Sequence, residues 1–221
     1  VLNVDIDALL EGARAARNAG LQPFSNNPAA KSAAIHHHHY LQNRNISNMF
    51  LFSPDLESLG KWYRQLMGES LGKEFNKDNT ETVNAGITPT VSVGSTDLHS
   101  VAQLYLGGPD DTYHEFVTVN HEEVRLPKRP EFETLVEDIQ GKAFSDIMDA
   151  ILQGTQGAFK KRGRPYSTVT LPGLDERSLG EFLQMKMMEM MFLGHLLDVN
   201  PFDQPNVESY KKITKELLKQ Q

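Results

Sequence analysis

The sequence predicts an α/β protein in which helices cover both faces of a parallel sheet. The run Met49–Phe52 is apolar without a break and lies between polar, turn-forming segments, a pattern typical of a strand buried on both faces. Three further short strands are predicted at 90–93, 115–120 and 166–171, and helical segments separate them. Strands that alternate with helices favour right-handed crossover connections and therefore a parallel sheet.

The helical segments are recognised by apolar residues that recur at three- and four-residue spacing. In the first of them Ile6, Leu9 and Ala13 share one face, and Gly20 is the natural end. The predicted helices are, in chain order, 4–18, 29–40, 56–71, 98–106, 132–159, 179–197 and 207–219. Residues 76–84 are polar and are predicted to form a loop.

The segment 179–197 differs from the other helices because it is apolar on almost every side. It holds five of the eight methionines, all between Met185 and Met191. A helix of this kind is usually buried in a core or against another subunit. We favour that interpretation over a methionine-rich binding groove.

The elements divide the chain into three parts. Residues 1–46 are predicted to form an N-terminal helical linker segment, and residues 47–176 an α/β domain. Residues 177–221 are predicted to be a helical C-terminal extension that packs on this domain. A chain of 221 residues fits one large domain with an appendage.

The composition excludes several classes of protein. The chain has no cysteine, which removes disulfide frameworks, iron–sulfur clusters and thiol catalysis. Its formal net charge is −7, so nucleic acid is not an expected partner. No signal-peptide pattern is present, and Lys186, Glu189 and His195 interrupt the longest apolar stretch. We therefore expect a cytoplasmic protein with no membrane partner.

Two polar runs raise the question of a metal or phosphate site. Consecutive side chains of a helix point in different directions, so at most two of His36–His39 can share one metal ion. A solvated or interfacial helix face is the favoured interpretation. The basic run 160–164 (KKRGR) can attract a phosphate, but in an acidic protein an exposed loop is favoured.

Three residues are notable for their positions on predicted helices. Glu69 lies near the end of its helix, off the apolar stripe and beside Gly68. His99 lies in a first turn, where the helix dipole disfavours a positive charge and keeps the imidazole neutral. Lys211 also lies in a first turn, where its charge does not stabilise the helix. From position alone, an ordinary surface role is favoured for all three.

Three motifs, in the right order, resemble the glucose-6-phosphate isomerase family. Residues 62–73 (WYRQLMGESLGK) resemble the helix that carries the catalytic base, and residues 94–100 (GSTDLHS) resemble the segment that carries the catalytic histidine. Residues 202–211 (FDQPNVESYK) resemble the C-terminal signature of the family. The similarity extends over nearly all 221 residues.

The resemblance implies a sugar-isomerase (SIS) fold, a flavodoxin-like three-layer sandwich. It also implies the reversible conversion of glucose 6-phosphate and fructose 6-phosphate through an enediol(ate), in glycolysis and gluconeogenesis. By this resemblance Glu69 is the base that moves a proton between C1 and C2. His99, supplied by the neighbouring subunit of a dimer, opens the sugar ring, and Lys211 assists at the ring oxygen. Gln65 and Gln204 are the implied substrate-binding residues, and no metal or organic cofactor is implied.

The chain departs from the family pattern in two ways. Asn206 stands where the family usually has a small residue. The family enzyme is also about twice this long, and its first SIS domain supplies most of the groups that bind phosphate. The chain therefore resembles the C-terminal half, with an N-terminal SIS domain as its partner. Because phosphate anchoring orients the reacting carbons, we expect the chain alone to be a weak or inactive isomerase.

Two other functions remain open on sequence grounds. One is a non-catalytic SIS module that binds a phosphosugar for regulation. The other is a structural role, in which the helix 179–197 and the face His36–His39 are association surfaces. The isomerase hypothesis is favoured because it alone uses all three motifs.

Overall fold

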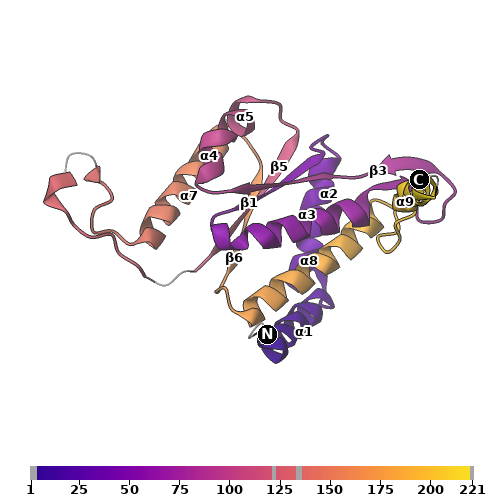
Figure 1. The fold of residues 1–221 in the computed structure, drawn as a ribbon, viewed down its shortest axis with the longest axis horizontal. Coiled ribbons are helices and arrows are strands. Elements are labelled where there is room, and N and C mark those ends of the chain that lie inside the picture. The colour runs from indigo at the N-terminus through magenta and orange to yellow at the C-terminus, as the bar shows by residue number, and fades with distance from the viewer. Residues whose placement is uncertain (1–3, 121–122, 133–135, 220–221) are drawn as a thin grey trace.

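A four-stranded parallel sheet runs through the centre of the molecule (Figure 1). The computed structural model describes residues 4–120, 123–132 and 136–219. The strands are β1 (Ile46–Leu51), β4 (Thr88–Val93), β5 (Thr112–Val119) and β6 (Tyr166–Leu171). They lie in the order β4-β1-β5-β6, and every neighbouring pair is parallel. The four predicted strands and the parallel sheet are confirmed.

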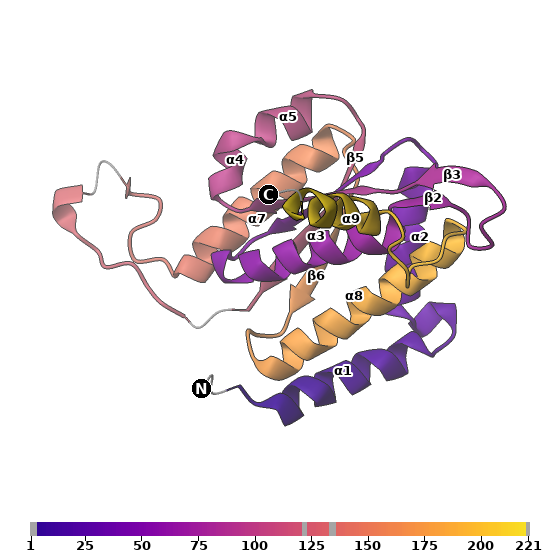
Figure 2. The same cartoon turned by 45° about the vertical axis from the view of Figure 1, so that its right-hand side comes forward.

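Each face of the sheet carries its own core cluster, since successive side chains of a strand point to opposite sides. Helices bury both clusters. Met49 and Leu51 of β1 belong to one core cluster, whereas Phe50 of β1 and Phe52, just after the strand, belong to another. The first cluster is covered by α2 (Pro28–Tyr40), α3 (Glu57–Leu71) and α8 (Glu176–Leu196). The second is covered by α4 (Thr96–Ser100), α5 (Ala102–Gly107) and α7 (Phe144–Lys161). Figure 2 shows the two helical layers on either side of the sheet, which confirms the predicted three-layer α/β class.

Helix α1 (Ile6–Gly20) lies along the outside of α8 (Figure 2). The two helices approach so closely that each needs a glycine at the crossing. A Cβ atom on Gly12 would lie 1.9 Å from the carbonyl oxygen of Arg177, and one on Gly180 would lie 2.0 Å from that of Leu9. A larger residue at either position would force the helices apart.

The predicted loop 76–84 is partly wrong. Strand β2 (Lys73–Phe75) and strand β3 (Thr82–Ala85) form a small antiparallel hairpin there. The side-chain oxygen of Asn76 accepts a hydrogen bond from the backbone N–H of Thr80 at 2.9 Å, which holds the turn. Backbone pairing and a local asparagine turn make this hairpin, so its polar composition concealed the strands.

Two predicted helices differ in the structure: one is broken in two and one begins later. The segment 98–106 breaks at Val101 into α4 and α5. The helix predicted at 132–159 begins only at Phe144, and residues 133–135 of that prediction lie outside the described residues. The backbone N–H of Leu126 donates to the carbonyl of Lys142 at 2.9 Å. Residues 142–144 thus pair with the segment 124–126, whereas residues 136–140 form a separate helical turn.

The methionine-rich helix α8 is buried along one side, which supports the core interpretation of its sequence. Met188 and Met190 are buried, whereas Met187 and Met191 are 39% and 45% exposed. The helix also carries the most buried ion pair of the described residues, between Lys186 and two glutamates.

That ion pair joins α8 to the sheet. The ammonium of Lys186 donates to both carboxylate oxygens of Glu115 on β5, at 2.8 and 2.6 Å, and to Glu189 at 2.8 Å. The hydroxyl of Tyr63 on α3 donates to the other oxygen of Glu189 at 2.6 Å. All four side chains are buried, so their hydrogen bonds replace the water that the charges lose.

The C-terminal helix α9 (Val207–Leu218) has no buried residue within its described length. Ile213 and Leu217 lie exposed on it. No helix of the described residues is long and apolar enough to span a membrane. The division of the chain at residues 46 and 176 stays a prediction.

We predict that Lys186→Met destabilises the protein by about 3–5 kcal/mol, because it leaves two carboxylates buried without a cation. The double variant Lys186→Met/Glu115→Gln should recover part of that loss, since one unpaired charge is removed with the lysine. The unfolding free energy from urea titration measures both effects.

The matched control is Lys61→Met, since Lys61 pairs with Glu57 at 2.7 Å while both side chains are at least half exposed. Its cost should be below about 1 kcal/mol. A Lys186→Met variant as stable as the Lys61→Met variant would show that the buried ion pair does not hold α8 in place.

Candidate active site

The direction of α3 places Glu69 at the amino-terminal edge of the sheet. Helix α3 runs antiparallel to β4, because it returns the chain from the end of one parallel strand to the start of the next. Its Gly60 faces Val91, where an added Cβ would lie 2.8 Å away, and its Gly68 faces Pro89, where an added Cβ would lie 4.0 Å away. Glu69 therefore lies beside the first residues of β4, with its side chain exposed.

Two glutamine amides hold the carboxylate of Glu69. Gln65, one helical turn earlier, donates from Nε2 to Oε1 at 3.1 Å. Gln204, from the segment before α9, donates from Nε2 to Oε2 at 3.0 Å. Both carboxylate oxygens are thus oriented by neutral donors. Gln65 and Glu69 lie on α3 and Gln204 lies far along the chain, so the three side chains meet only in the folded protein.

Lys211 lies on the same rim. Its ammonium pairs with Glu208 at 2.7 Å, three residues earlier on α9. The hydrogen bond to Glu208 and the charge of that carboxylate raise the pKa of Lys211, and the carboxylate of Glu69 adds a smaller contribution in the same direction. A positive charge therefore stands near the candidate base without a direct ion pair between them.

Lys73 connects the two segments of this site, and sequence reasoning gave it no role. It is buried, and its ammonium donates to the backbone carbonyl of Glu69 at 2.9 Å and to that of Asp203. It also lies 3.3 Å from the carboxylate of Asp203. Gln204 is the next residue, so Lys73 fixes the amide that reaches Glu69. The one available signal was its place just after the helix that carries Glu69.

His99 lies at the opposite edge of the sheet. It is exposed on α4, which follows the carboxyl end of β4. Pro89 and Val93 alone are ~13 Å apart along that strand, and His99 lies beyond Val93 whereas Glu69 lies beside Pro89. Figure 1 shows α4 and α9 at opposite ends of α3. One chain therefore brings together Glu69, Gln65, Gln204 and Lys211 but not His99.

Two of the four histidines of α2, His36 and His39, pack against the protein interior. His36 is buried, with Nε2 3.0 Å from the hydroxyl of Ser47. His39 stacks on Tyr113 with ring centroids 4.6 Å apart. Burial, and then the charge of Arg44, lower the pKa of His39 to about 4. The expectation of a solvated or interfacial face was thus wrong for His36, which belongs to the interior.

The structure also bears on the metal and phosphate questions. Among residues 4–120, 123–132 and 136–219, no three His, Cys, Asp or Glu side chains lie close enough to hold a metal ion. In the basic run, Arg164 lies 3.2 Å from the carboxylate of Asp110. That arginine is already paired, which supports a structural role for it rather than phosphate binding.

The Glu69 site holds groups that could serve proton transfer on a hydroxylated anion. A carboxylate can act as a base, amides can bind hydroxyl groups, and lysines supply positive charge. Within one chain the site is open to solvent, so other parts are needed to exclude water from it.

Comparison with known proteins gives a consistent result. No family model matches the chain. It is 36% identical over 221 residues to a glucose-6-phosphate isomerase of Carboxydothermus hydrogenoformans, a match that covers 99% of this chain and 47% of the relative. It is also 36% identical over 220 residues to a glucose-6-phosphate isomerase of Methanocaldococcus jannaschii, covering 99% of this chain and 52% of the relative.

Solved structures agree with this fold. A hypothetical protein from Thermus thermophilus superposes with a TM-score of 0.90 at 31% identity, over 97% of this chain and 51% of that one. A glucose-6-phosphate isomerase from Chlamydia trachomatis superposes with a TM-score of 0.80 at 21% identity, over 96% of this chain and 42% of that one. At 21% identity the second likeness bears on the fold alone.

The fold and the matches define an α/β protein of the sugar-isomerase (SIS) type. The chain is related along nearly its whole length to the glucose-6-phosphate isomerases, as the three motifs predicted. It spans about half the length of the curated relatives it matches.

We predict that Lys73→Met releases the segment 202–206 from α3. The unfolding free energy should fall by about 1.5–3 kcal/mol, as expected when a charged donor with several acceptors is removed. Hydrogen exchange of amides 202–206 should become faster at the same time.

Lys77→Met is the matched control, because Lys77 pairs with Asp198 at 2.9 Å while both side chains are about half exposed. It should cost less than about 1 kcal/mol. Unchanged exchange at 202–206 in the Lys73→Met variant would mean that Lys73 does not position Gln204.

Proposed function

We propose that this chain is the C-terminal half of a glucose-6-phosphate isomerase. Together with an N-terminal SIS domain, it interconverts glucose 6-phosphate and fructose 6-phosphate. The observation that carries the proposal is the carboxylate of Glu69, held by Gln65 and Gln204 with Lys211 on the same rim. The names of the relatives and the three motifs support the same activity.

In the proposed mechanism Glu69 is the base of the isomerisation. It removes the proton from C2 of the open-chain aldose and returns it to C1, so that a cis-enediol(ate) lies between aldose and ketose. The proton returns from the same carboxyl group while the hydroxyl proton passes from O2 to O1, so the atoms balance and no electron acceptor is needed. Gln65 and Gln204 hold the carboxylate and bind substrate hydroxyls, and Lys211 balances negative charge near the ring oxygen. An N-terminal domain would hold the phosphate and exclude water.

Ring opening is assigned to His99 of a second copy. The opposite-edge placement of Glu69 and His99 supports a dimer in which each site takes the base from one chain and the histidine from the other. A two-fold interface of this kind is the commonest oligomer symmetry. The activity belongs to glycolysis and gluconeogenesis, and the proposed location is the cytoplasm.

We predict that the chain alone converts fructose 6-phosphate slowly or not at all, and that adding the N-terminal half restores turnover. Glu69→Gln should then lower kcat by about 100- to 10,000-fold, as expected for the loss of a general base. A coupled dehydrogenase assay measures glucose 6-phosphate formation.

The matched control is Glu74→Gln, another exposed carboxylate five residues further along the chain, which should leave kcat unchanged. If the folded, reconstituted protein shows no turnover, the non-catalytic phosphosugar module becomes the better hypothesis. If Glu69→Gln retains full turnover, Glu69 is not the base.

A mixing experiment tests the shared site. Glu69→Gln and His99→Ala chains, each reconstituted with the N-terminal half, should be inactive by themselves. An equal mixture allowed to exchange subunits should regain about a quarter of the wild-type activity, since half of the dimers are mixed and each carries one intact site. An inactive mixture that contains mixed dimers by mass spectrometry would contradict the shared site.

A further inference from the structure

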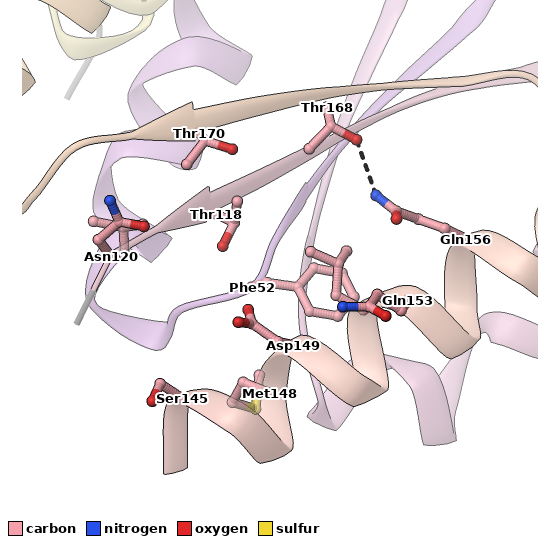
Figure 3. Close-up of a pocket in the computed structure, with 12 residues that line it drawn as sticks. Phe52, Thr118, Asn120, Ser145, Met148, Asp149, Gln153, Gln156, Thr168 and Thr170 are labelled. Carbon is pink, nitrogen blue, oxygen red and sulfur yellow. Dashed lines mark hydrogen bonds between the residues drawn. The ribbon is translucent and has the colours of Figure 1, made fainter. Parts of the chain in front are cut away.

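A second cleft lies at the carboxyl edge of the sheet, far from Glu69. It has a volume of about 560 Å³ and lies between the ends of β5 and β6 and the first half of α7 (Figure 3). In open parallel sheets, ligands bind outside the carboxyl ends of the strands, where the strand order reverses. The reversal here falls between β1 and β5, and this cleft lies at the same edge one strand further along. The isomerase proposal uses His99 at this edge but none of the residues that line the cleft, so the cleft has no assigned role.

The strand side of the cleft is lined by threonines where a core would be apolar. On β6, Tyr166, Thr168 and Thr170 point to the face that α7 covers, since they alternate along the strand. Tyr166 is packed against Phe116 with ring centroids 5.3 Å apart. Beyond this aromatic pair the face becomes hydroxylated, because Thr170 is paired in register with Thr118 of β5.

The helix side of the cleft is polar as well. Ser145, Asp149 and Gln156 recur on α7 at helical spacing and line the cleft together. A helix that covers a sheet normally turns an apolar stripe toward it. Here a polar stripe of the helix faces polar residues of the strands, and Figure 3 shows Thr118 and Thr170 opposite Asp149.

Most of these polar groups do not bind one another. Within the described part of the chain, one hydrogen bond joins two side chains of the lining, from Nε2 of Gln156 to the hydroxyl of Thr168 at 2.9 Å. The hydroxyls of Thr118 and Thr170 and the carboxylate of Asp149 are left for water or a ligand. The floor of the cleft is apolar, with Phe52, Met148 and Leu152.

The charge of the cleft selects the ligand class. Asp149 is the one charged side chain of the lining among the described residues. A carboxylate repels a phosphate, whereas it accepts hydrogen bonds from hydroxyl groups. Threonine hydroxyls and glutamine amides both donate and accept, which suits a ligand with several hydroxyl groups. The volume lies within the ~300–1,000 Å³ typical of small-molecule sites.

We propose that this cleft binds an uncharged, polyhydroxylated molecule, a free sugar or a polyol, at a site separate from the isomerase centre. Asp149 and the threonines Thr118, Thr168 and Thr170 bind its hydroxyl groups, and the floor of the cleft packs against its carbon skeleton. The inference does not rest on the proposed isomerase activity, because no residue that lines the cleft belongs to the proposed isomerase site.

The test is a titration of this chain with glucose and with sorbitol, followed by backbone amide NMR. Saturable shifts should appear at residues 118–120 and 168–170. Glucose 6-phosphate should bind there at least tenfold more weakly, because its phosphate meets the carboxylate of Asp149. Both Asp149→Ala and Thr170→Val should weaken sugar binding at least fivefold. Both residues are exposed, so unchanged thermal unfolding can verify that the variants fold.

Glu69→Gln is the matched control and should leave sugar binding within twofold of the unaltered chain, whatever its effect on turnover. Any of three results would overturn the proposal. These are shifts that do not saturate with either neutral probe, tighter binding of the phosphate ester at the cleft, or sugar affinity unchanged in both cleft variants.

Discussion

The buried ammonium of Lys186 is the interaction on which the arrangement of the helices depends. It uses its three donors on the carboxylates of Glu115 and Glu189, and it lies 4.9 Å from the ring centroid of Tyr63. Burial opposes the charged form of Lys186, but the two carboxylates outweigh burial and raise its pKa. Burial likewise opposes ionised Glu189, and the charge of Lys186 outweighs it and lowers that pKa. Each ion is stable inside the protein only because the other is there.

This network also fixes the helix that carries the candidate base. The hydroxyl of Tyr63 binds Glu189, so α3 cannot slide along the sheet without breaking a buried hydrogen bond. Gln65 and Glu69 lie just after Tyr63 on the same helix, so anchoring Tyr63 also fixes where they lie. At the far end of α3, Lys73 then ties the segment of Gln204 to that helix. The geometry at Glu69 thus rests on two lysines that are buried for structural reasons.

The sequence predicted those features that local patterns encode. Unbroken apolar runs such as Met49–Phe52 identified the strands of the sheet, and the order of strands and helices identified the three layers. The motif residues Glu69, Gln65, Gln204 and Lys211 do meet at one edge, although their functions stay predictions. The structural roles of Lys186 and Lys73 were not predicted, because each lysine has a decisive partner far along the chain, 71 and 130 residues away respectively. Composition alone treats a lysine as a surface residue.

The cleft at the carboxyl edge could not be predicted from the sequence, for a different physical reason. Threonine is favoured in strands whether it faces solvent, a core or a ligand. The sequence therefore identified Thr168 and Thr170 as strand residues but not as residues that line a cleft. Their significance depends on what stands opposite, and that is set by the packing of α7. The two edges of the sheet then differ in charge: lysines stand around Glu69, whereas Asp149 is the charged group of the cleft. Cations beside Glu69 suit a phosphorylated sugar, whereas the lone carboxylate of the cleft suits a neutral one, so the two proposed sites would select different ligands.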